Sequence, residues 1–326
     1  METITHRKEG GKTYESLVIS RRVDGSPITI PVITVEGGGK GPSLGVVGCV
    51  HGDEQEGPAA VFRLVERLDP RRLVGRVVFV PVLNLPALEA RKRGNPLDDW
   101  DYDMNRLYPG GPSGSLTQRT AHAFCEAILS RMDMVVAIHS GGSNIYCVER
   151  VILHGDAGME MGKAMGPRWE LIAKGVGERA GIADMVTIAE RSGKPGITLE
   201  LGGVSGRLPE TFRQNVTSIV EGIENVMRYF KMVPGEVKRP REWIVTAYEP
   251  IRNTQGGILI FEEGCELKKH VKGGTPLVTM VDVFGNVLER ITAPYDGIIL
   301  AVPAQPSLPS GGAQIMSIGK VQEVLT

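Results

Sequence analysis

The sequence predicts an α/β fold, with a mixed, mostly parallel sheet flanked by helices and a small C-terminal all-β domain. Through the first two thirds of the chain, apolar runs rich in β-branched residues alternate with segments of helical periodicity, which is typical of parallel strands joined by helices. The character changes at residues 232–241, a stretch with two prolines and several charges that suits a linker. Helical periodicity disappears beyond it, so we divide the chain into residues 1–234 and residues 235–326.

Five segments of the first part predict strands. Residues 28–37 alternate between apolar and polar side chains and end in a glycine-rich turn. The other four segments are continuous apolar runs, as expected of strands that are covered on both faces: residues 43–50, 76–84, 134–140 and 196–203. Polar residues stand near the ends of these runs, where open α/β sheets place their ligands.

Three further segments predict helices: residues 57–69, 115–131 and 208–230. Pro58 stands near the start of the first, and apolar residues follow at helical spacing. Ser115 and Gln118 form the pattern of a capping box at the start of the second. After the linker, short apolar segments separated by Gly and Pro predict strands instead: residues 256–263, 275–282 and 296–303.

Composition limits the partners and the compartment. The net charge is −1 and the calculated pI is about 6.6, so no overall field attracts nucleic acid or an anionic membrane. No apolar run approaches the ~20 residues of a membrane-spanning helix, and the polar N-terminal segment lacks the apolar stretch of a signal peptide. The four cysteines are scattered without a CxxC pair, which indicates free thiols in a reducing compartment. We therefore expect a cytoplasmic enzyme that binds neither nucleic acid nor membranes; a homo-oligomer is left open.

The densest polar cluster, CVHGDEQEG, follows the first buried run. His51 and Glu54 lie three residues apart in it, and both an imidazole and a carboxylate are good zinc ligands. His139 stands at the end of another buried run. Two histidines and one glutamate leave one position of a tetrahedral zinc open, which is typical of a catalytic site. Because H-x-x-E also occurs by chance, a surface salt bridge remains the alternative for the first two residues.

Two other segments carry candidate substrate-binding residues. Asn105 and Arg106 are adjacent in DYDMNRLYPGG, and the planar fork of an arginine suits a substrate carboxylate. The alternative is a turn in which Arg106 forms a surface salt bridge with Asp103. Arg93, in RKRGNP, is one of several basic residues there and could be merely solvated.

Glu200 lies inside the apolar run GITLELGG. A carboxylate in a buried strand is costly unless it is paired, hydrogen-bonded or protonated. Glu200 is therefore the best general-base candidate in the chain, and a structural glutamate held by backbone donors is the alternative.

Four motifs, GCVHGDEQEG, DMNRLYPG, AIHSGG and ITLELGG, occur in the order expected of the succinylglutamate desuccinylase and aspartoacylase family. That family belongs to the wider group of zinc carboxypeptidases of the carboxypeptidase A type. The resemblance covers about residues 28–230, and the C-terminal β segment is similar to the smaller domain that the family appends. The HSGG version most resembles N-acetyl-diaminobutyrate deacetylases.

The resemblance implies a role for each candidate residue. It implies one Zn²⁺ per chain with three ligands: His51, Glu54 and His139. It implies Glu200 as the base, Asn105 and Arg106 as the pair that grips the substrate carboxylate, and Arg93 as the residue that polarises the scissile carbonyl. Arg91 and Lys92 crowd that last assignment. Many relatives have Asp two residues before the third ligand, where this chain has Ala137.

The activity that this resemblance implies is zinc-dependent hydrolysis of the amide bond of a small N-acylated amino acid. A metallocarboxypeptidase acting on short peptides is the alternative, because the zinc chemistry is the same and only the shape of the pocket differs. A non-catalytic ligand-binding protein is disfavoured by the presence of Glu200 with all three ligands. A nucleotide-binding protein is disfavoured because GGGKGPS lacks the full P-loop pattern.

The C-terminal domain is expected to pack beside the zinc cleft and to narrow access to it. Tyr295, in the turn APYDG, is a candidate for a residue that reaches the substrate, with a surface tyrosine as the alternative.

Overall fold

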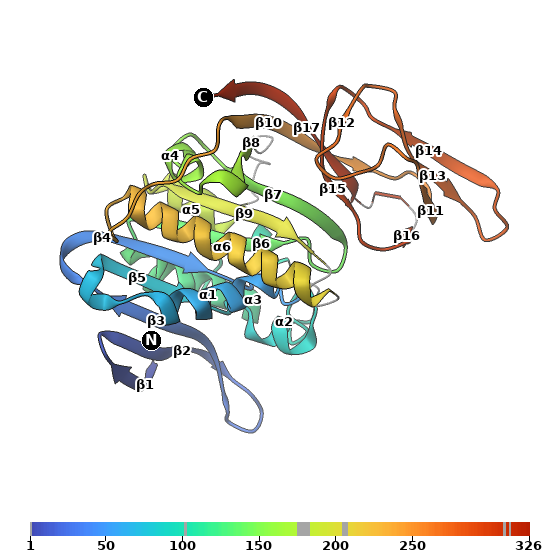
Figure 1. The fold of residues 1–326 in the computed structure, drawn as a ribbon. Helices are drawn as coiled ribbons and strands as arrows, with labels where there is room; N and C mark the ends of the chain where they lie inside the picture. Colours follow the sequence, from blue (N-terminus) through green and yellow to red (C-terminus); the bar gives the residue numbers. More distant parts are fainter. Residues whose placement is uncertain (1, 101–102, 175–182, 204–207, 309–310, 313) are drawn as a thin grey trace.

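The computed structural model describes residues 2–100, 103–174, 183–203, 208–308, 311–312 and 314–326. Its strands form a 13-stranded sheet and a second, four-stranded sheet (Figure 1). The centre of the large sheet has the order β5-β4-β6-β9, and its strands are parallel. These strands span the following residues: β4 Gly38–Val47, β5 Val74–Val80, β6 Met134–Ser140 and β9 Gly196–Gly202. The predicted buried runs therefore form the middle of the sheet.

Antiparallel strands extend this centre on both sides. One side has the order β1-β2-β3, with β3 paired to β5, and the other continues through β7 and β8. Their bounds are β1 Thr3–Glu9, β2 Lys12–Arg21, β3 Pro27–Glu36, β7 Ile145–Leu153 and β8 Leu171–Lys174. The mixed α/β character is confirmed, but a mostly parallel sheet is not. Among the described residues, strands pair in parallel in two groups, β5-β4-β6-β9 and β7-β8-β10.

Helices cover both faces of the central strands. α1 and α6 share one core cluster with alternate residues of β4, β5, β6 and β9, and α3 and α5 share another on the opposite face. In Figure 1, α6 and α1 lie side by side over the central strands. The α-helices are α1 Glu56–Arg67, α2 Leu85–Ala90, α3 Leu116–Ala127, α4 Met159–Lys163, α5 Met185–Arg191 and α6 Pro209–Tyr229. Single 3₁₀ turns span Pro70–Arg72, Met104–Arg106, Leu129–Arg131 and Pro167–Trp169.

Local signals account for the helix starts. The Ser115 hydroxyl accepts a hydrogen bond from the Gln118 amide, and the Gln118 side chain accepts one from the Ser115 amide, so the predicted capping box is confirmed. Pro209 begins α6, where a missing N–H costs nothing. No helix in the described ranges is long and apolar enough to cross a membrane.

Beyond the linker, the described residues form strands alone. β10, β17, β15 and β12 continue the large sheet, and β14, β13, β11 and β16 form the four-stranded sheet. Their bounds are β10 Trp243–Arg252, β11 Gly257–Phe261, β12 His270–Val271, β13 Pro276–Val281, β14 Val287–Thr292, β15 Gly297–Pro303, β16 Ser307–Leu308 and β17 Gln314–Leu325.

The large sheet crosses the boundary that the sequence suggests at residues 234/235. β10 pairs in parallel with β8, and β15 pairs antiparallel with β7. Val148 and Leu171 from the first part pack with Ile298 and Leu300 from the second. The division into two domains remains a prediction, and backbone hydrogen bonds and a shared apolar cluster join its two parts.

Candidate metal centre

The candidate ligands come from one loop and the end of a neighbouring strand. β4 and β6 are adjacent and parallel, so the loop after β4 opens beside the last residues of β6. This brings His51 and Glu54, from the loop, to His139 near the end of β6. The loop packs tightly at Gly52, where a Cβ atom would lie 2.0 Å from the backbone carbonyl carbon of Ala87. Glycine is the residue that allows this approach.

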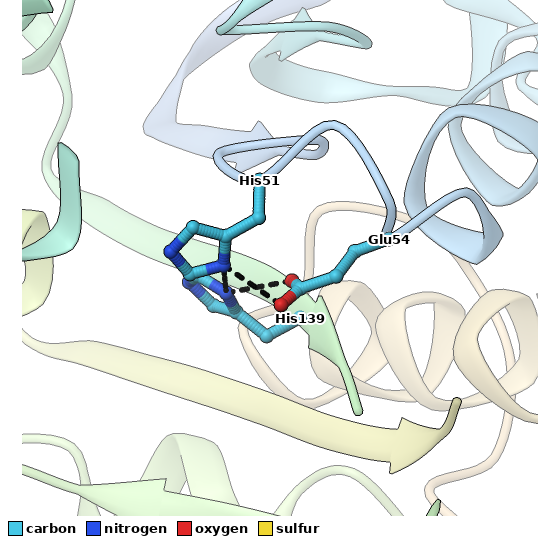
Figure 2. A group of neighbouring side chains, drawn as sticks. All are labelled: His51, Glu54 and His139. Atoms are coloured by element: carbon cyan, nitrogen blue, oxygen red, sulfur yellow. Dashed lines mark hydrogen bonds and ion pairs between the residues drawn. The ribbon is translucent and has the colours of Figure 1, made fainter. Parts of the chain in front are cut away.

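The three side chains converge on one point (Figure 2). His51 Nδ1 lies 2.7 Å from Glu54 Oε1, and His139 Nδ1 lies 2.9 Å from Glu54 Oε2. The two Nδ1 atoms are 3.2 Å apart. The residues are only 1%, 2% and 3% exposed, in chain order, so all three polar groups are withdrawn from water. Among the described residues, this is the one His/Cys/Asp/Glu group with ligand atoms close enough to hold a metal ion.

The donor set fits a divalent metal. Two imidazole nitrogens and one carboxylate oxygen form the ligand set of many catalytic zinc sites, which leaves one position for water or substrate. A buried carboxylate with two imidazoles turned toward it also matches the requirement that metal ligands present their lone pairs to a common point. The predicted residues therefore form a candidate metal site, as the sequence indicated.

Asp103 and Arg93 surround this cluster. Asp103 Oδ1 lies 3.0 Å from His51 Nε2, the ring nitrogen that faces away from Glu54. A carboxylate at that nitrogen fixes the orientation of a ligand ring. Arg93 donates from Nη2 to Asp103 Oδ2 at 3.0 Å, and its Nη1 lies 3.4 Å from Glu54 Oε1. The guanidinium therefore lies at the edge of the candidate metal site.

The opposite charges of these groups stabilise one another's ionised forms. Burial disfavours a charged imidazole, but the carboxylates of Glu54 and Asp103 outweigh it and raise the pKa of His51 to about 9. Burial likewise opposes ionisation of Glu54, yet His51 and His139 lower the pKa of Glu54 far below its usual range. For Asp103, His51 and Arg93 overcome the same effect of burial and lower its pKa strongly. The Glu54 carboxylate is thus held ionised, as metal coordination requires, whereas a metal would have to displace a proton from the His51 imidazole.

The structure distinguishes Arg93 from its basic neighbours. Arg91 and Lys92 are exposed, whereas Arg93 contacts two carboxylates of the cluster. Ala137 packs in the core at 1% exposure, so it brings no carboxylate to the ligands, and Asp103 contacts His51 instead.

Glu200 lies on β9, directly beside the third candidate ligand. Its Cα is paired with that of His139 on β6 and with that of Arg150 on β7. Directly paired residues of neighbouring strands project to the same face, so Glu200 and His139 share a face of the sheet. The Glu200 side chain is 16% exposed, and its Oε2 lies 3.6 Å from Arg150 Nη2. Glu200 is thus a half-buried carboxylate that is paired with Arg150, and its role as a base is a proposal.

Asn105 and Arg106 lie in the 3₁₀ turn next to this cluster. The Asn105 amide donates to Asp103 Oδ1 at 2.9 Å, the same oxygen that contacts His51. Asn105 Oδ1 is buried and has no hydrogen-bond partner among the described residues. The Arg106 side chain is 47% exposed and lies 3.9 Å from Asp103, which has a closer partner in Arg93. The turn therefore presents an amide and a guanidinium beside the site.

Tyr295 precedes β15 in the C-terminal part. Its hydroxyl donates to the Ile318 carbonyl at 2.8 Å, and its ring packs against the C-terminal core cluster. This contact holds the side chain within that part of the molecule. Substrate binding by Tyr295 stays a prediction that these contacts do not support.

Two buried charged residues near the site were missed from the sequence. Glu56 is 1% exposed and accepts from Ser140 at 2.9 Å, next to His139. Arg150 is 3% exposed and faces Glu200. The signal for Arg150 was charge inside the otherwise apolar run CVERVIL, whereas GDEQEG is polar throughout, so no such signal marked Glu56. The signal for Arg150 is the one that identified Glu200 in GITLELGG.

Known proteins share sequence and fold with this chain. Residues 40–230 match the succinylglutamate desuccinylase/aspartoacylase catalytic domain. Over 223 residues, the chain is 34% identical to the N-alpha-acetyl-L-2,4-diaminobutyric acid deacetylase of Halomonas elongata. That match covers 66% of this chain and 62% of the deacetylase, so it spans less than two thirds of that protein's length.

Solved structures share the fold over nearly the whole chain. A product-bound ectoine utilization protein from Ruegeria pomeroyi has a TM-score of 0.85 at 23% identity, covering 97% of this chain and 98% of its own. A succinylglutamate desuccinylase/aspartoacylase from Rhodobacter sphaeroides has a TM-score of 0.83 at 24% identity, covering 97% of each chain. The family domain covers more than half of this sequence and contains every residue of the candidate metal cluster. The chain belongs to the succinylglutamate desuccinylase/aspartoacylase family.

Proposed function

We propose that the protein is a zinc-dependent deacylase that hydrolyses the amide bond of a small N-acylated amino acid. The observation that carries this proposal is the convergence of His51, Glu54 and His139 on one point, with Glu200 paired to His139 on the neighbouring strand. Family membership supports the class of reaction. Metal identity, one ion per chain and the residue roles are part of the proposal.

His51, Glu54 and His139 would hold the metal. When bound, it supplies Lewis acidity, which polarises the amide carbonyl and makes water a better nucleophile near neutral pH. Glu200 accepts the proton of the attacking water and later delivers it to the leaving amine. Its position on a strand beside His139 supports this role, because a base must lie within reach of the water that attacks.

Arg93 and the Asn105–Arg106 turn have separate roles, one toward the carbonyl oxygen and the other toward the substrate carboxylate. The Arg93 guanidinium, held between Glu54 and Asp103, stabilises negative charge that develops on the carbonyl oxygen. Arg106 and Asn105 bind the substrate carboxylate, for which a half-exposed guanidinium fork is suited. A substrate held at both ends lies with its amide over the metal site.

The substrate class that we propose is N-acetylated diamino acids, as in the name of the Halomonas relative. A carboxypeptidase acting on short peptides would use the same groups, so the two are separated by experiment. The cytoplasmic location, the absence of nucleic-acid and membrane partners, and the oligomeric state stay predictions.

The test is a liquid-chromatography screen of the zinc-loaded protein against N-acyl amino acids and dipeptides. It should include Nα-acetyl-2,4-diaminobutyrate, N-acetylaspartate and N-succinylglutamate. We expect release of the free amino acid from one N-acylated substrate, and loss of that release after chelation and its return with zinc. Turnover of dipeptides alone would replace the deacylase with a peptidase. No turnover of either class would overturn the proposal.

A further inference from the structure

Arg150 is a buried cation on β7 that has no role in the reaction proposed above. The residue is 3% exposed, and a charge withdrawn from water is costly unless an opposite charge and hydrogen bonds compensate it. Its Nη2 lies 3.6 Å from Glu200 Oε2, and its Nη1 donates to the Leu300 carbonyl at 2.9 Å. One guanidinium thus links the proposed base to a strand from the other end of the chain.

On the side of Glu200, the pairing is set by the backbone. Arg150 and Glu200 are direct partners in the antiparallel pairing of β7 with β9. Glu200 Oε2 is buried and has no hydrogen-bond partner among the described residues, so the ion pair with Arg150 is the contact described for this oxygen. The Cys147 thiol also interacts with Glu200 and Arg150. Burial and the Glu200 carboxylate raise the pKa of Cys147 far above its usual range, so this thiol stays neutral beside the ion pair.

On the other side, the C-terminal strands hold the guanidinium. Leu300 is fully buried on β15, which pairs with β7. Tyr248, on β10, places its ring 5.6 Å from Arg150 Cζ, within the range of a cation–π contact. Contacts from β15 and β10 thus hold the Arg150 guanidinium on the side opposite Glu200.

We propose that Arg150 is a positioning residue for Glu200, and that the C-terminal strands act on the reaction through it. Arg150 holds the Glu200 carboxylate in the orientation from which it reaches the attacking water. The carbonyl of Leu300 fixes Arg150 in turn. This inference rests on the proposed function only for the role of Glu200 as the base. A purely structural ion pair would make the same contacts, so the test must separate the two.

The kinetic test uses Arg150→Met and Arg150→Lys in two backgrounds, the native chain and Glu200→Gln. In the native background, Arg150→Met should lower kcat about 10- to 100-fold, as loss of a partner that orients a catalytic group does, and leave KM nearly unchanged. Arg150→Lys keeps the charge and should recover part of kcat. In the Glu200→Gln background, Arg150→Met should have almost no further effect, because residues that act as a unit are not additive.

The matched control is Arg76→Met. Arg76 also lies on a strand of the large sheet and donates to a backbone carbonyl, that of Arg131, but it contacts no residue of the site. It should leave kcat unchanged. The positioning role is excluded if Arg150→Met lowers kcat equally in both backgrounds, or no more than Arg76→Met does.

A structural readout separates this inference from the proposed function. In crystal structures of the Arg150→Met and Arg150→Lys variants, the Glu200 carboxylate should be displaced or split between conformers after methionine and nearly native after lysine. If Arg150→Met does not fold, Arg150→Lys alone must still lower kcat while retaining zinc. A kcat of Arg150→Lys equal to that of the native protein would reject the inference. If Glu200→Gln keeps its turnover, the proposed base is wrong, and the crystal structures still decide whether Arg150 positions Glu200.

Discussion

The metal cluster and the Arg150–Glu200 pair lie on neighbouring strands of one sheet, but they are assembled differently. His51 and Glu54 belong to the loop that follows β4, and His139 lies on β6, the neighbour of β4 in the sheet. Arg150 needs β9 on one side and, on the other, strands from the far end of the sequence. The first cluster therefore depends on the pairing of β4 with β6, whereas the second depends on β7, β9, β10 and β15.

Substitutions in the two clusters should therefore have different effects. Changes in the metal cluster should remove the metal and with it all chemistry. Changes in the Arg150–Glu200 pair should leave the metal bound and slow the chemistry. The predictions below follow this division, from the largest expected effect to the smallest.

His139→Ala should abolish both zinc binding and turnover, because it removes one of the three candidate ligands that the described residues bring together in a buried site. Elemental analysis of the purified protein measures the metal content, with about one zinc per chain expected in the native form. His154→Ala is the matched control, since His154 contacts Asp184 and Thr198 rather than the metal cluster. Stoichiometric zinc in His139→Ala would show that the ligand assignment is wrong.

Glu200→Gln should keep zinc and substrate affinity and lose about 10²- to 10⁴-fold in kcat, the range typical of a general acid–base group. The amide preserves the shape of the side chain and removes its basicity. Glu149→Gln is the matched control, because Glu149 lies on β7 and pairs with Lys268 instead. Single-turnover rates with equal zinc loading make the measurement. A near-native kcat would place the base elsewhere and remove the distinction drawn above.

The distinction between the metal cluster and the Arg150–Glu200 pair also explains which strands and site residues could be predicted from the sequence. Residues 134–140 and 196–203 were predicted as strands almost to the residue, because uninterrupted apolar runs signal burial on both faces. The first buried run, 43–50, extends too far, since the chain leaves β4 after Val47 and Cys49 already has a positive φ of 51°. The metal cluster followed from these strands because parallel neighbours end at the same edge of the sheet.

The parts that were missed depend on partners far along the chain. β7 carries Glu149 and Arg150, which interrupt its apolar pattern, and these charges pair with the distant residues Lys268 and Glu200. The hairpin β1–β2 lies at an edge and is too polar to read as a strand pair from periodicity. The antiparallel flanks follow from such hairpins and from the C-terminal strands, so the central runs alone overstated the parallel character.

Arg106→Lys tests the substrate side of the metal cluster. A lysine keeps the charge but cannot present two parallel N–H groups to a carboxylate. Loss of a hydrogen bond to a charged group typically costs about 1.5–3 kcal/mol, so kcat/KM should fall about 10- to 100-fold. The exposed Arg91 provides the control variant, Arg91→Lys. An amidated substrate should react as slowly with the native enzyme as the acid does with the variant; equal rates on acid and amide would return Arg106 to a structural role.

Asp184→Asn should have the smallest effect. Like Arg150, Asp184 is a largely buried ionisable residue that contacts a partner far along the chain, here His154, but it lies at the N-cap of α5 and away from the site. Its Oδ2 lies 2.9 Å from His154 Nδ1, and its Oδ1 accepts from the Thr187 amide as the N-cap of α5. Burial opposes ionisation, but His154 and the Thr187 amide outweigh it and lower the pKa of Asp184 below its ordinary value. A carboxyl whose pKa is lowered by folding stabilises the protein above its unfolded pKa of about 3.9.

That contribution is lost as the pH falls through the lowered pKa, so Asp184→Asn should matter at neutral pH and cease to matter in acid. Asparagine keeps the cap and removes only the charge, which should cost about 1–2 kcal/mol in the free energy of unfolding above pH 5. Denaturant unfolding of both proteins between pH 3 and 7 measures the difference. The variant should have the same kcat as the native protein at each pH, because Asp184 contacts none of the site residues described. Asp69→Asn, at an exposed cap, should have a smaller effect because solvent screens its charge. A fall in kcat comparable to that of Arg150→Met would mean that any charged cluster in the sheet affects turnover, and the special position of Arg150 beside Glu200 would lose its support.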